Sequence, residues 1–153
     1  MPLLLHVDSS ADLLNARSRQ VTAALLDLGA VLTAPGCARS WTREILWEWR
    51  LAHIADTAEL VVSELVTNSV TVSRGLNQSA IRLILILDRD ELVILVRDGH
   101  PGTPQPKHPG EEDLNGRGLL LVDTLSDRYG WYPLGEEGPG KVVWAVLADR
   151  ADG

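Results

Sequence analysis

Glu64 and Asn68 are the residues whose types and spacing most suggest chemistry. They stand four positions apart in Glu64-Leu-Val-Thr-Asn68, so on a helix their side chains project from one face. The surrounding run from Asp56 to Arg74 is apolar almost all round, which predicts a buried helix that Asp56 could cap. A carboxylate in such a place is costly unless it is paired or put to use. The pair is therefore either a polar contact inside the fold or part of a functional site.

Two glycine-containing segments are further candidates. Asp98 follows an apolar run in the pattern Asp98-x-His-x-Gly102, and Gly116-Arg117-Gly118 precedes the apolar stretch that begins at Leu119. Taken singly, the first is typical of a turn and the second of the start of a helix. Neither segment matches the dinucleotide-binding fingerprint or the phosphate-binding loop that ends in Gly-Lys-Ser/Thr.

The periodicity of the chain predicts the elements that would position these residues. In chain order we predict a strand at residues 1–7, a helix from about residue 10 to 28, a short β-rich stretch at 31–33, a break at 35–36, a helix from about 38 to 51, the helix at 56–74, hairpin strands at 81–87 and 92–96, a loop at 105–115, a helix at 119–125, and strands at 129–132 and 142–147.

This order predicts an α+β fold. Strands that come in hairpins favour a two-layer α/β sandwich, with helices on one face of a mixed, mostly antiparallel sheet. Residues 1–30 would be an N-terminal extension packed on a domain that spans 31–153. In the helix after residue 36, Trp41, Ile45 and Trp49 recur every four residues and would face the core, whereas Trp47 lies off that stripe.

Composition limits the classes of function. The chain has 153 residues, which is enough for one domain with a substantial core. Its formal net charge of −7 argues against a protein that binds nucleic acids or anionic membranes in general. Cys37 is the single cysteine, so no internal disulfide can form. We see neither a signal peptide nor an apolar run of membrane-spanning length, and expect a cytoplasmic protein.

Together the three segments resemble the N box, G1 box and G2 box of the Bergerat ATP-binding fold. The chain is most similar to the small stand-alone anti-sigma-factor serine/threonine kinases of bacterial partner-switching systems. That resemblance is carried by Glu64-Leu-Val-Thr-Asn68-Ser-Val, Val96-Arg-Asp98, Gly116-Arg-Gly-Leu-Leu-Leu-Val-Asp123 and Gly140-Lys-Val-Val-Trp144, and covers roughly residues 33–147.

The resemblance implies a role for each of the three polar residues. Asn68 would hold Mg²⁺ through its amide oxygen. Glu64 would act as general base on the attacking hydroxyl or position water. Asp98 would accept a hydrogen bond from the amino group of the adenine of ATP.

The resemblance also assigns roles to the glycines. Gly102 would let the backbone pass close to the base. Gly116, Arg117, Gly118 and Leu119 would bring backbone N–H groups and a helix N-terminus to the phosphates, with Arg117 adding charge there or lying in solvent. The loop at 105–115 would close over the triphosphate.

The implied activity is transfer of the ATP γ-phosphate to a serine or threonine of a protein antagonist, with a sigma factor as the alternating partner. The family tends to dimerise, so a homodimer is a further expectation. Three positions depart from the family pattern. Val72 stands where the family commonly has a histidine, His100 where it usually has a glycine or serine, and Val142 where it usually has a threonine. They leave open an alternative, a non-catalytic module of the same fold that acts by sequestering a protein partner.

Overall fold

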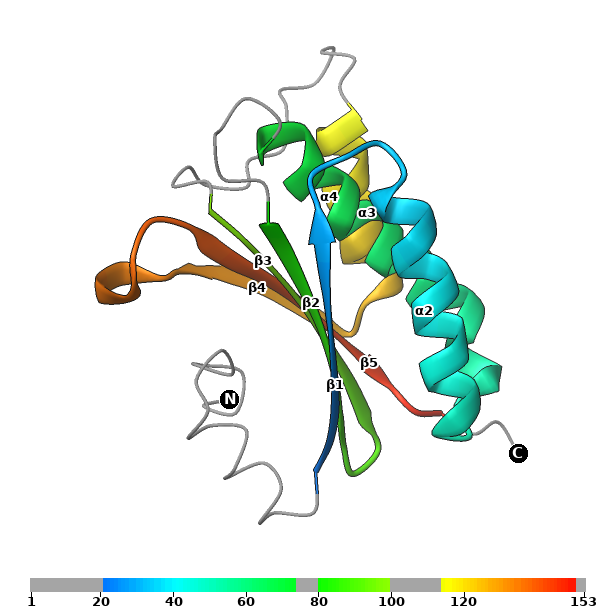
Figure 1. Cartoon of the computed structure of the whole chain (residues 1–153). Helices are drawn as coiled ribbons and strands as arrows, with labels where there is room; N and C mark the ends of the chain where they lie inside the picture. The colour runs from blue at the N-terminus through cyan, green and yellow to red at the C-terminus, as the bar shows by residue number, and fades with distance from the viewer. Residues whose placement is uncertain (1–20, 74–79, 100–113, 151–153) are drawn as a thin grey trace.

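The computed structural model describes residues 21–73, 80–99 and 114–150, apart from the side chains of 114–119. Its described part is a five-stranded sheet with helices α2, α3 and α4 packed on one face (Figure 1). The predicted α+β two-layer sandwich is confirmed, and all four strand pairings within these ranges are antiparallel. No helix among them is long and apolar enough to cross a membrane.

The strands lie in the order β1-β2-β3-β5-β4. Their bounds are β1 Thr22–Gly29, β2 Ala80–Asp88, β3 Glu91–Asp98, β4 Arg128–Pro133 and β5 Lys141–Ala148. The predicted hairpin is confirmed as β2 and β3, and the two predicted C-terminal strands as β4 and β5. The chain thus places the C-terminal end of β3 beside the first residue of β5.

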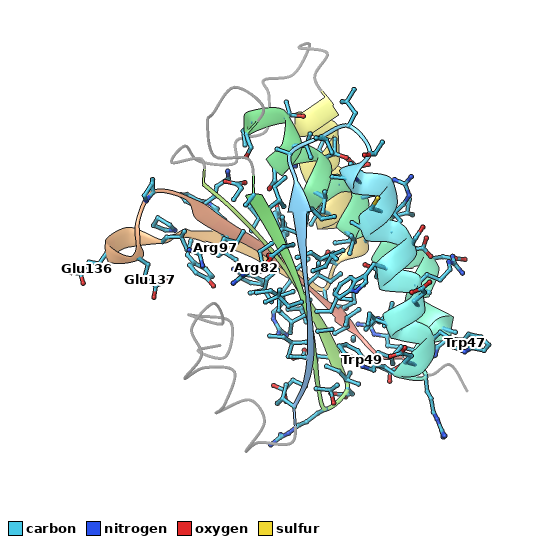
Figure 2. All side chains as sticks on the ribbon, viewed as in Figure 1. Trp47, Trp49, Arg82, Arg97, Glu136 and Glu137 are labelled. Carbon is cyan, nitrogen blue, oxygen red and sulfur yellow. The ribbon has the colours of Figure 1, made fainter. Side chains whose placement is uncertain are left out.

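The sheet has two different faces because successive side chains of a strand point to opposite sides. On the helix side, Leu92, Ile94 and Val96 of β3 join the main core with α2, α3 and α4. On the other side a smaller cluster includes Val93 and Leu95. Arg82 and Arg97 also lie on that far face, away from the helices (Figure 2).

Helix α3, Ala55–Ser73, is the central helix and packs against both α2 and α4. Most of its apolar side chains are buried as predicted, Val61, Val62, Leu65 and Val66 among them, whereas Leu60 is 48% exposed. The helix begins one residue before Asp56, so that residue is not the cap. A 3-10 turn at Ala52–Ile54 runs directly into the helix, and the Asp56 carboxylate instead accepts a 2.8 Å hydrogen bond from Arg43 of α2.

Helix α2 spans Ala34–Glu48, so it begins four residues and ends three residues earlier than predicted. The expected break at Pro35-Gly36 is absent because proline is tolerated in the first turn, where its missing N–H has no partner to lose. The period-four stripe is confirmed, since Trp41, Ile45 and Trp49 pack against the main core. Trp47 is 74% exposed and projects away from the sheet (Figure 2).

The predicted helix to residue 28 is wrong over its described part, because residues 22–29 form β1. Each of these residues pairs with β2, and Leu26 and Leu28 pack against the main core at a period of two. Pairing with a neighbouring strand therefore overrides a pattern that is compatible with a helical stripe. The β-rich stretch at 31–33 is a turn that leads into α2, and the strand predicted at 1–7 lies outside the described residues.

Candidate functional site

Helix α3 carries Glu64 and Asn68 one turn apart, as their spacing predicts. Both side chains are half-buried rather than enclosed in the core. The next residue, Ser69, is buried and donates a 2.7 Å hydrogen bond to the carboxylate of Asp98, at the end of β3. This bond ties the helix that bears Asn68 to the strand end that bears Asp98, so the structure brings two of the three predicted segments together.

The amide oxygen of Asn68 is a candidate ligand atom on the helix face that carries Glu64. Its Oδ1 atom is buried and has no hydrogen-bond partner in the described part of the protein, a property it shares with a few other atoms such as Thr42 Oγ1 and Ser73 Oγ. A buried acceptor left unpaired costs about 1–3 kcal/mol, so such atoms call for a physical explanation. A neutral amide oxygen is a ligand that Mg²⁺ accepts, so the donor chemistry of this position fits the predicted metal.

Burial also affects Glu64. Desolvation raises the pKa of its carboxyl above the ordinary value of 4.5. Loss of hydration disfavours the ionised form, as expected for a carboxylate at the edge of an apolar helix. A carboxyl with a raised pKa is a better match for accepting a proton near neutral pH than an exposed one.

Glu64→Gln should therefore stabilise the protein at neutral pH. A carboxyl whose pKa is raised on folding favours the folded state below pH 4.5, and this contribution is lost as the pH rises through the raised pKa. The neutral amide removes the cost of the ionised group. Urea unfolding should show a higher midpoint for the variant at pH 8, with a difference that shrinks toward pH 4.5. A difference that is constant with pH would contradict this origin.

Asp98 lies in a buried polar network rather than at an open surface. Its side chain is 0% exposed, and that of Lys141, which stands directly opposite it on β5, is 5% exposed. The Lys141 ammonium donates to both carboxylate oxygens, at 2.9 and 3.0 Å. With the Ser69 hydroxyl, these contacts join α3, β3 and β5 at one end of the sheet.

Gly140 allows this close approach between β3 and β5. Its φ is +126°, and a Cβ atom built there would lie 2.3 Å from the backbone oxygen of Asp98. Only glycine satisfies both conditions without strain. The residue before Lys141 therefore permits the backbone course from which the lysine reaches Asp98.

Gly140→Ala should destabilise the protein by about 3 kcal/mol or more, because backbone strain and a clash with the Asp98 carbonyl add together. Gly135→Ala is the matched control. Gly135 also has a positive φ, +64°, but a Cβ atom there would meet nothing within 4 Å, so about 1–2 kcal/mol is expected. Denaturant unfolding of the two variants measures the difference. Equal losses would show that the close approach contributes nothing.

The other predicted positions are only partly described. Gly116, Arg117, Gly118 and Leu119 fall inside helix α4, Leu114–Leu125, which starts five residues before the predicted helix. Glycine weakens a helix by about 1 kcal/mol but does not end it. Gly102, His100 and most of the predicted loop at 105–115 lie outside the described residues.

The position of Val142 changes the interpretation of its missing hydroxyl. Its side chain is buried in the far-face cluster, pointing away from the helices, so the hydroxyl it lacks would not have reached this site. Its neighbour Lys141 is the β5 side chain that meets Asp98. Val72, the other departure inside the described region, is half-buried one turn after Asn68.

Two members of the site, Ser69 and Lys141, were not predicted from the sequence. A serine in an otherwise apolar, buried helix must find a partner, which is a usable signal for Ser69. The position of Lys141 depends on the register between β3 and β5, which pairs it with a residue 43 positions earlier. Local sequence patterns carry no information on that pairing.

Comparison with protein families agrees with the geometry. Residues 14–147 match the histidine kinase-like ATPase domain, which covers most of the chain. No curated protein matches the chain. The match includes α3 with Glu64 and Asn68, the end of β3 with Asp98, and the helix with Gly116 to Leu119. The chain belongs to the histidine kinase-like ATPase domain family, and its fold is the Bergerat type that its sequence motifs predict.

Proposed function

We propose that the protein is an ATP-dependent serine/threonine kinase that phosphorylates a protein antagonist and regulates transcription by partner switching. The observation that carries the proposal is the buried, unpaired amide oxygen of Asn68, one helical turn from a carboxyl whose pKa is raised. An oxygen ligand and a proton acceptor on one helix face are what phosphoryl transfer requires of this helix.

In this proposal Asn68 would hold Mg²⁺, which would supply positive charge against the negative charge that develops on the phosphoryl group during transfer. Glu64 accepts the proton of the attacking serine or threonine hydroxyl. The hydroxyl oxygen forms a bond to the γ-phosphorus while the bond to the β-phosphate oxygen breaks, and ADP leaves. The family match supports ATP binding, while the protein substrate rests on the resemblance of the motifs alone.

The test is phosphotransfer from radiolabelled Mg-ATP to small antagonist proteins encoded in the same genome. Incorporation of label on a serine or threonine of one antagonist is the expected result, and the unphosphorylated antagonist should compete with a sigma factor for the protein. Absence of transfer to every antagonist tested, by a protein that binds Mg-ATP, would overturn the kinase assignment.

One observation favours a second candidate, a non-catalytic module that sequesters its partner. Asp98, the proposed adenine acceptor, is engaged by Lys141 and Ser69 and has no exposed surface. A protein of this kind would bind its antagonist or sigma factor equally well with and without ATP. Phosphotransfer that is lost in Glu64→Gln would exclude this candidate.

A further inference from the structure

Lys141 occupies a chemically specific position in the proposed nucleotide site. Its ammonium lies where it donates to both oxygens of the Asp98 carboxylate, at 2.9 and 3.0 Å, and almost nothing of either side chain is exposed. The pair is built into the sheet, since the two residues are direct partners in the antiparallel register of β3 and β5. It is therefore a fixed feature of the fold rather than a chance surface contact.

The carboxylate of Asp98 has limited capacity for a ligand. An ionised carboxylate only accepts hydrogen bonds and has about four lone-pair directions. Ser69 uses one of them, and the two contacts of Lys141 use two more. An adenine amino group is also a donor, so it competes with these protein donors for the same oxygens.

We propose that Lys141 determines nucleotide specificity. Its ammonium occupies the hydrogen-bonding position on Asp98 that the amino group of a bound base would take. This inference rests on the proposed binding of ATP. Because the Asp98 side chain is 0% exposed, a base can reach it only when Lys141 withdraws, and the base then lies beside the displaced ammonium. Lysine suits this role because a flexible four-carbon stem carries its charge, so that the head group can move while the pairing of β5 with β3 keeps the backbone in place.

The consequence is weak discrimination between purines. Adenine presents an amino donor at its 6-position, which Asp98 accepts once it is released. Hypoxanthine presents an oxygen there, and the Lys141 ammonium can donate a hydrogen bond to that oxygen. The wild-type protein should therefore bind Mg-ATP and Mg-inosine triphosphate with similar affinity, although a carboxylate alone would favour adenine strongly.

The experiment is calorimetric titration of the full chain with Mg-ATP and Mg-inosine triphosphate. Lys141→Met keeps a long unbranched side chain but removes the donor. It should raise the affinity for ATP and increase the preference for ATP over inosine triphosphate by at least about tenfold. Arg128→Met is the matched control, because it breaks the ion pair between Arg128 and Glu91. That pair also joins a cation to a carboxylate of β3, but it is partly exposed and lies at the opposite end of the strand. This variant should leave the preference unchanged.

A folded Lys141→Met protein with the same preference as the wild type would overturn the inference while leaving the proposed function intact. Lys141→Arg is a second variant that keeps the charge, and serves where the methionine variant does not fold. The planar guanidinium holds a carboxylate through two parallel bonds, so ATP should bind more weakly than to the wild type. ATP binding as tight as in the wild type would overturn the inference. Binding of neither nucleotide by any folded variant, including the wild type, would overturn the proposed function itself.

Discussion

Replacing Asp98 by alanine is expected to lower the free energy of unfolding by about 3–5 kcal/mol. The substitution leaves the Lys141 ammonium, whose side chain is 5% exposed, without the carboxylate to which it donates. It also removes the acceptor of the Ser69 hydroxyl, which is buried. Urea unfolding at pH 7 measures the loss.

The double variant Asp98→Ala/Lys141→Met tests the origin of that loss. Removing both charges leaves no buried ion unpaired, so the double variant should be much more stable than the sum of the two single changes implies. The exposed pair formed by Arg128 and Glu91 is the control, and Glu91→Ala should cost no more than about 1 kcal/mol. Additive losses for Asp98 and Lys141 would mean that the two charges are not coupled in the folded protein.

Glu64→Gln is expected to reduce the rate of phosphotransfer by about a hundred- to ten-thousandfold, because the amide cannot accept the proton of the attacking hydroxyl. The same substitution should stabilise the fold at neutral pH, since it removes a partly desolvated charge. Loss of activity together with a gain in stability distinguishes a functional carboxylate from a structural one. Single-turnover labelling of the antagonist and urea unfolding, done on one protein preparation, give both quantities.

Glu48→Gln provides the control for that comparison. Glu48 is an exposed carboxylate at the end of α2, so its substitution should change neither the rate nor the stability beyond small surface effects. A Glu64→Gln protein that transfers phosphate at the wild-type rate would remove Glu64 from the mechanism.

Local patterns predicted much of the helix layer and the hairpin. The i, i+4 spacing of Glu64 and Asn68 needs only a helix to place both on one face, and α3 is apolar enough to identify it. The hairpin at β2 and β3 is recognisable because its strands are close in sequence and rich in β-branched residues.

Features that depend on distant pairing were missed. Strand β1 was predicted as a helix because its leucines also fit a helical stripe, and the contact that decides the matter is with β2, more than 50 residues later. The Lys141–Asp98 bridge has the same character, since it exists only once β5 adds to β3. The first turn of α2 was missed for a local reason, because proline is excluded from helix interiors but not from their starts.

The most direct test of the account is calorimetric titration of the wild type and Asn68→Ala with ATP, each with Mg²⁺ and with a chelator. We predict that Mg²⁺ strengthens ATP binding to the wild type, and that Asn68→Ala loses this effect, with affinity for Mg-ATP reduced by at least about tenfold. The variant should be at least as stable as the wild type, because the buried oxygen it removes has no partner among the described residues and is costly to leave unpaired. Binding that is equally strong without Mg²⁺, or unchanged in a folded Asn68→Ala protein, would contradict the assignment of Asn68 as the metal ligand.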